Sequence, residues 1–178
     1  MSSDPRYPIG RFALDGGAAP DAALRATWIA DIAACPRRLR DAVADLSDAQ
    51  LDTPYRDGGW TVRQLVHHVP ESHLNAYVRF KLALTEPEPT IKPYDEARWA
   101  ELPDVASTPI AVSLDLLQAL HVRWVALLQT FGPAEWRRGY RHPELGEVVP
   151  LDAALGMYAW HGRHHVAHVT ALRERMGW

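Results

Sequence analysis

The residues of this chain best suited to chemistry are its nine histidines, four of which fall within residues 161–168. An imidazole can ligate a metal ion or carry a proton near neutral pH. Four histidines on one helix can also form a solvated face or a pH-sensitive interface, and that alternative stays open. Helical geometry indicates which of the four could act together.

On an α-helix successive residues advance by about 100°, so two ligands for one ion lie three or four positions apart. The apolar sector of the last long helix is centred near Val169, with His165 inside it and His161 at its edge, about 40° from His165. His168 lies slightly further out and His164 further still. The geometry therefore predicts His161 and His165 as a metal-binding pair.

A third ligand is expected from the histidine pair at positions 67 and 68. If the second long helix buries the face of Leu65 and Ala83, His68 lies on the inward flank and His67 lies on the solvent side. Three neutral imidazoles leave a fourth tetrahedral position open for water, which is typical of catalytic zinc. The sequence therefore predicts a metal site on His68, His161 and His165.

Three more residues are candidates for supporting roles around such a site. His121 lies on an apolar stripe, where it is either a core histidine with a hydrogen-bond partner or a support for a metal ligand. His164 is a neighbour of the predicted pair. Glu71 could accept a proton, although in a regular helix it points away from the face of Leu65. We assign no catalytic residue.

The remaining residues of interest carry no pattern that indicates chemistry. His73 and His142 are expected on the surface. Cys35, the one cysteine of the chain, lies on a helical apolar stripe and is interpreted as a small core residue.

The elements that must position these side chains are mostly helical. Four long amphipathic segments predict an all-α four-helix bundle, with a small β-hairpin before the last helix. Pro36 is expected to kink or interrupt the first of these helices, and Pro70 is expected to bend the second just after His67 and His68. A long connection after the second helix would let the second and third helices run parallel. The predicted helices are residues 22–46, 61–84, 109–131 and 152–176, and the hairpin is within 138–150.

Composition sets the class of protein. The 178 residues suit a single domain, 1–178, and the net charge of −3 gives no basic surface for nucleic acid. No apolar signal core and no stretch near 18 apolar residues is evident, so we expect neither export nor a membrane span. One cysteine suits a reducing compartment, and we expect a cytoplasmic protein.

Several stretches resemble the DinB/YfiT-like family: residues 55–68, 79–86, 92–96 and 158–168. The resemblance implies a DinB-like four-helix bundle with one divalent ion per chain on His68, His161 and His165. We expect zinc, with nickel as the alternative. Relatives form homodimers, so the resemblance also implies a homodimer. Pro70 departs from the family pattern, which usually has alanine or another helix former there.

The resemblance implies a metal-dependent hydrolase that activates water to attack a small-molecule substrate. Related proteins transfer low-molecular-weight thiols such as bacillithiol, so a thiol S-transferase is the second hypothesis. A metal-binding stress protein without enzymatic activity is the third. The same open metal position would serve hydrolysis and thiol transfer, so the ligands alone do not separate them.

Overall fold

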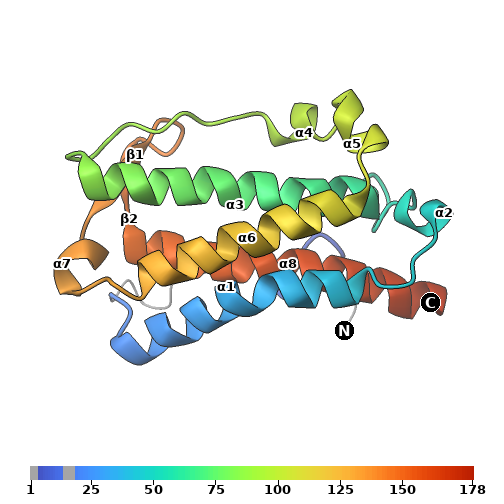
Figure 1. Ribbon diagram of the computed structural model, residues 1–178, viewed down its shortest axis with the longest axis horizontal. Coiled ribbons are helices and arrows are strands. Elements are labelled where there is room, and N and C mark those ends of the chain that lie inside the picture. The colour runs from blue at the N-terminus through green and yellow to red at the C-terminus, as the bar shows by residue number, and fades with distance from the viewer. Residues whose placement is uncertain (1–3, 14–18) are drawn as a thin grey trace.

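The computed structural model describes residues 4–13 and 19–178 and confirms the predicted four-helix bundle. The long helices are α1 (Ala22–Ala42), α3 (Val62–Thr85), α6 (Ile110–Leu128) and α8 (Leu151–Met176). Figure 1 shows α3 and α6 running in the same direction, while α1 and α8 run the opposite way. The connection between α3 and α6 returns along the length of the bundle, as predicted.

Short elements close the two ends of the bundle and line the long connection (Figure 1). The predicted hairpin is present, and its two strands pair antiparallel with Tyr140 opposite Val149. These elements are α2 (Asp48–Leu51), α4 (Glu96–Trp99), α5 (Pro103–Ser107), α7 (Pro133–Trp136), β1 (Gly139–His142) and β2 (Glu147–Pro150).

The start of α3 is fixed by the capping box that its sequence predicts. Thr61 Oγ1 accepts a hydrogen bond from the Gln64 backbone N–H at 3.1 Å, and Gln64 Oε1 accepts one from the Thr61 N–H at 2.9 Å. Both bonds satisfy N–H groups that a helix start leaves unpaired. The box therefore sets the register of α3, and with it the place of His68 two turns further on.

The interruption considered at Pro36 does not occur, and the helix that contains Pro70 is continuous as well. Pro36 lies inside α1 and Pro70 lies inside α3, and both are buried. A proline removes one backbone hydrogen bond, but the packing of the rest of a long helix can outweigh that loss. The segment that carries His68 is therefore one continuous helix.

Close contact between α1 and α8 places the histidines of α8 at the centre of the bundle. A Cβ added to Gly162 would lie 2.7 Å from Cys35 Sγ, and one added to Gly156 would lie 2.9 Å from the ring of Trp28. Only glycine allows this approach without a shift of neighbouring atoms. Cys35 is buried in the core, as predicted.

In the part of the chain that the structure describes, one helix, α6, is long and apolar enough to cross a membrane by length and composition alone. We had expected no such segment from the sequence. In the structure α6 packs against α1 and α3, with Leu117 and Trp124 fully buried between them.

Candidate functional site

Three histidines from two helices converge on one point. His161 Nε2 lies 3.3 Å from His68 Nε2 and 3.1 Å from His165 Nε2. All three ligand atoms lie within 4.8 Å of one another. The structure therefore brings together the three residues that helical geometry selected, one from α3 and two from α8.

The spacing and protonation of these imidazoles fit a divalent cation. Nitrogen ligands at 2.0–2.1 Å from a tetrahedral ion are about 3.3–3.4 Å apart, close to the two distances found. Burial lowers the pKa of His68 to about 4. Burial, and then the neighbouring histidines, hold the pKa values of His161 and His165 well below their usual range. All three are therefore neutral at pH 7, as metal ligands must be.

A chain of hydrogen bonds continues from His161 into the core. His161 Nδ1 lies 3.1 Å from His73 Nε2, and His73 Nδ1 lies 2.8 Å from His121 Nε2. The chain ends where His121 Nδ1 donates to the carbonyl oxygen of Ile32 at 2.6 Å.

The carbonyl at the end of this chain sets the direction of every bond in it. A carbonyl only accepts, so His121 must carry its proton on Nδ1 and accept at Nε2. Neutral His73 then donates from Nδ1, and His161 donates from Nδ1 to His73. The Nε2 lone pair of His161 is consequently left free to face His68 and His165, which is the tautomer that metal binding requires.

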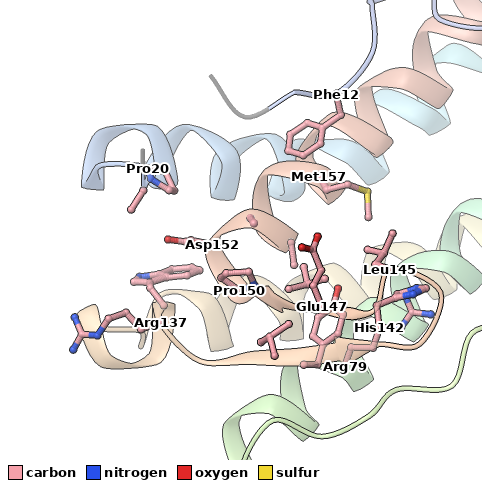
Figure 2. Close-up of a pocket in the computed structure, with 17 residues that line it drawn as sticks. Phe12, Pro20, Arg79, Arg137, His142, Leu145, Glu147, Pro150, Asp152 and Met157 are labelled. Atoms are coloured by element: carbon pink, nitrogen blue, oxygen red, sulfur yellow. The ribbon is translucent and has the colours of Figure 1, made fainter. Parts of the chain in front are cut away.

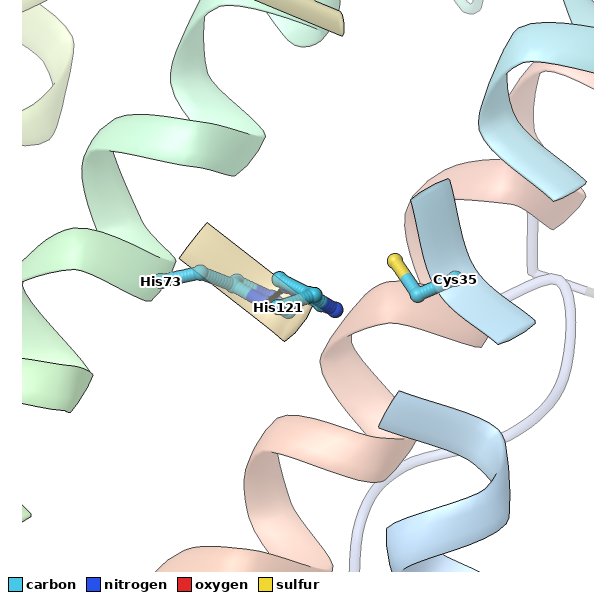
Figure 3. A group of neighbouring side chains, drawn as sticks. All are labelled: Cys35, His73 and His121. Carbon is cyan, nitrogen blue, oxygen red and sulfur yellow. Dashed lines mark hydrogen bonds between the residues drawn. The ribbon is translucent and has the colours of Figure 1, made fainter. Parts of the chain in front are cut away.

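A second group, Cys35, His73 and His121, also has its ligand atoms within 4.8 Å of one another (Figure 3). Both nitrogens of His121 are already used in hydrogen bonds, to Ile32 and His73. Burial raises the pKa of the Cys35 thiol to about 12, so it is protonated. A protonated thiol is a poor ligand, and this inner group is therefore a hydrogen-bonded core.

The surface positions expected for several histidines were wrong. His73 is fully buried, and His67 is 4% exposed with Nδ1 2.7 Å from Ser113 Oγ on α6. His67 is covered because α5 and α6 pack along the side of α3 that was expected to face solvent. His142 is half-buried. The helical pattern did carry a signal for His73, which follows buried Val69 by four positions.

His164 and His168 are also more buried than the helical wheel indicated, because loops cover that side of α8. The ring of Trp160 stacks on His164 with centroids 4.3 Å apart, and Trp160 Nε1 donates to the carbonyl of Gly10 in the N-terminal segment. The ring of Tyr55 packs edge-on against the ring of His168, with the two centroids 4.2 Å apart. A wheel describes one helix and takes no account of such covering segments.

The three supporting candidates have different outcomes. His121 is buried. It does not bond to His161 directly but bonds to His73, which in turn bonds to His161. His164 lines the same cavity as the three converging histidines. Glu71 is half-buried, and it is not among the described residues that line this cavity. The pKa of Glu71 is raised, first by burial and then by the charge of Asp104.

The converging histidines open into a cavity of about 550 Å³. Three arginines line it, Arg6, Arg56 and Arg79, and the described lining includes one carboxylate, that of Glu96. Sequence reasoning missed Arg79. Its signal was its spacing, since a residue eleven positions after His68 lies within about 20° of it on a helix.

Comparison with known proteins assigns the chain to a family. The family model of the DinB superfamily matches residues 31–169, a span that includes all three converging histidines. The chain belongs to the DinB superfamily. The resemblance seen in the sequence is thereby confirmed.

Relatives in this superfamily match along nearly the whole chain. A protein of Bacillus mycoides (strain KBAB4) is 55% identical over 175 residues, covering 98% of this chain and 99% of its own. A protein of Bacillus cereus (strain 03BB102) is 54% identical over 176 residues and 99% of each chain. Both bear the name "Putative metal-dependent hydrolase".

A solved structure agrees with the same assignment to the DinB superfamily. YfiT from Bacillus subtilis superposes with a TM-score of 0.93 at 49% identity, over 98% of each chain. It is described as a probable metal-dependent hydrolase with an unusual four-helix bundle topology. In this chain the four long helices form two parallel pairs, α1 with α8 and α3 with α6 (Figure 1).

Proposed function

We propose that this protein is a metal-dependent hydrolase of small molecules, with one divalent ion held by His68, His161 and His165. The observation that carries the proposal is the convergence of three neutral Nε2 atoms at the wall of a cavity. His161 Nε2 lies 3.1 Å from His165 Nε2 and 3.3 Å from His68 Nε2. The names of the relatives support it. We propose zinc as the ion, with nickel as the alternative, because both accept imidazole ligands.

A divalent ion held by these three neutral ligands would keep its full charge and would supply a Lewis acid that lowers the pKa of water. The residues of the chain do the rest. His73 accepts the Nδ1 proton of His161 and thereby holds that ring in its ligating orientation. The cavity would admit a small molecule and water beside the three histidines.

Tyr94 is placed to orient a substrate in the same cavity. Its hydroxyl is buried and has no hydrogen-bond partner within the described part of the chain. Burial raises the pKa of Tyr94 well above its usual range, so the hydroxyl stays protonated. We propose that it donates a hydrogen bond to a substrate oxygen.

Activity measurements on the zinc-loaded and nickel-loaded protein separate the hypotheses. The assays offer an activated ester, 4-nitrophenyl acetate, and an electrophile, 1-chloro-2,4-dinitrobenzene, each with and without small thiols. We expect metal-dependent ester hydrolysis by the wild-type protein and its loss in the variant His68→Ala. The control, His67→Ala, removes a histidine outside the described lining of this cavity and should retain metal-dependent hydrolysis. Product formed only with a thiol would reject hydrolysis in favour of thiol S-transfer. Bound metal without turnover in either assay would favour a metal-binding stress protein.

The homodimer and the cytoplasmic location stay predictions. Large apolar side chains are exposed on α3 and α6, and these could contribute to an interface between two copies: Leu74, Val78, Val112, Leu116 and Val122. Sedimentation of the metal-loaded protein would test the dimer, with a monomer at all concentrations as the contradicting result.

A further inference from the structure

Arg79 is a buried cation beside the proposed metal centre. Arg79 lies on α3 and is only 9% exposed. Its guanidinium donates a hydrogen bond to the Tyr158 hydroxyl at 3.3 Å. A guanidinium has five N–H donors, and this is the one hydrogen bond it makes to a side chain among the described residues. No carboxylate oxygen of the described chain lies within 4.0 Å of it.

A buried charge without a counter-ion is costly, so such a group is usually paired or placed for a ligand. The carboxylates around Arg79, those of Asp95, Glu96 and Glu144, border a smaller opening and are all exposed. None forms an ion pair with Arg79 in the structure. The unpaired guanidinium therefore faces cavity space that an anion could occupy.

Arg79 also connects two cavities. Together with His142 and Met157 it lines both the cavity of the three histidines and a second cavity of about 850 Å³ (Figure 2). The second cavity lies beneath the β1–β2 hairpin. Its apolar wall includes Phe12, Tyr140, Leu145, Val148, Val149 and Met157.

The charged residues of the second cavity do not neutralise Arg79. Asp152 pairs with Arg25 at 3.2 Å. Glu147 and Arg137 lie at its edge and are exposed. A ligand that satisfies Arg79 and fills this cavity must therefore bring its own negative charge on an apolar body.

We propose that Arg79 binds an oxyanion of the substrate, a carboxylate or a phosphate, while an apolar part of the same molecule occupies the cavity beneath the hairpin. The substrate is then an amphipathic acid. That its reactive bond lies at the three histidines rests on the proposed function, whereas the oxyanion site itself stands on Arg79 and the two cavities.

Calorimetric binding of three probes tests the proposal: 4-phenylbutyrate, its neutral amide 4-phenylbutyramide, and inorganic phosphate. The wild-type protein should prefer the carboxylate to the amide by about tenfold or more, as expected for a charge-assisted pair of hydrogen bonds. Arg79→Gln should abolish that preference, and Arg79→Lys should retain part of it. The control, Arg163→Gln, removes an exposed arginine that pairs with Asp31 at 3.3 Å and should leave the preference intact.

The outcomes separate this site from the metal centre. His161→Ala should lose the metal and keep the preference for the carboxylate, while Arg79→Gln should keep the metal and lose that preference. Equal binding of carboxylate and amide to the wild type, or an unchanged preference in Arg79→Gln, would overturn the oxyanion site. Tighter binding of phosphate than of 4-phenylbutyrate would overturn the role of the apolar cavity.

Discussion

Two groups of potential metal ligands lie side by side in this protein and share a hydrogen bond, yet their chemistry differs. The outer group, His68, His161 and His165, opens into a cavity. The inner group, Cys35, His73 and His121, is sealed in the core. In both, the ligand atoms lie within 4.8 Å of one another, so distance alone does not tell them apart.

The two groups differ in whether their ligand atoms already have hydrogen-bond partners or carry a proton. In the inner group every nitrogen has a hydrogen-bond partner, and burial keeps the Cys35 thiol protonated. In the outer group the converging Nε2 atoms contact, among residues 4–13 and 19–178, no hydrogen-bonding group other than one another. The inner group therefore orients the outer one, because the carbonyl of Ile32 fixes the tautomer of His161 through two other rings.

The largest expected effect comes from removing the central ligand of the outer group. His161→Ala should reduce the metal content from about one ion per chain to near zero, because two ligands rarely hold zinc against buffer. Cys35→Ser, in the inner group, should leave the metal content unchanged. Elemental analysis of the two purified variants measures this, and metal lost from Cys35→Ser would reverse the comparison.

A smaller loss is expected when the bond between the two groups is cut. His73→Phe keeps an aromatic ring but removes the acceptor of the His161 Nδ1 proton, and should weaken metal binding by about 10- to 100-fold. His67→Phe is the matched control, since it removes a buried histidine of α3 that bonds to Ser113. Competition with a chromophoric chelator gives both affinities. Equal affinities would show that the inner group does not orient the ligands.

How far the sequence predicted this arrangement also differs between the groups. The outer group was found from helical spacing, because its three residues lie on the inward faces of regular helices with clear apolar stripes. The hairpin and the parallel α3–α6 pair were predicted from turn residues and the length of the connection. These features depend on local pattern, which a single sequence carries.

The inner group was missed in part, and the reason is packing between elements. His73 was expected on the surface although it follows Val69 on a buried face, and His67 was expected in solvent although α5 and α6 cover it. Arg79 had a spacing signal but no partner that could be named without the two cavities. Contacts of this kind depend on which helices become neighbours, which periodicity does not specify.

The packing role of Cys35 can be tested against its neighbour on α8. Gly162→Ala would place a Cβ 2.7 Å from Cys35 Sγ and should lower the free energy of unfolding by about 1–3 kcal/mol, as overpacking does. Adding Cys35→Ala should restore part of that loss, because it removes the clashing atom. Urea unfolding of the single and double variants gives the interaction free energy between the two substitutions. Strictly additive losses would contradict a direct contact.

The smallest effect concerns how the inner group responds to pH. Burial lowers the pKa of His121 to about 4, from an unfolded value of 6.5. Between these values the unfolded chain binds the extra proton and the folded chain does not, so stability falls as the pH drops below about 6.5. His121→Gln can still hydrogen-bond but does not titrate. From pH 7 to pH 5.5 it should therefore lose about 1 kcal/mol less stability than the wild type. Urea unfolding at both pH values, with a chelator present, measures the difference. The same pH dependence in both proteins would mean that folding leaves the pKa of His121 unchanged. Burial would then not hold its ring neutral, and the direction of the hydrogen-bond chain toward His161 would no longer be fixed.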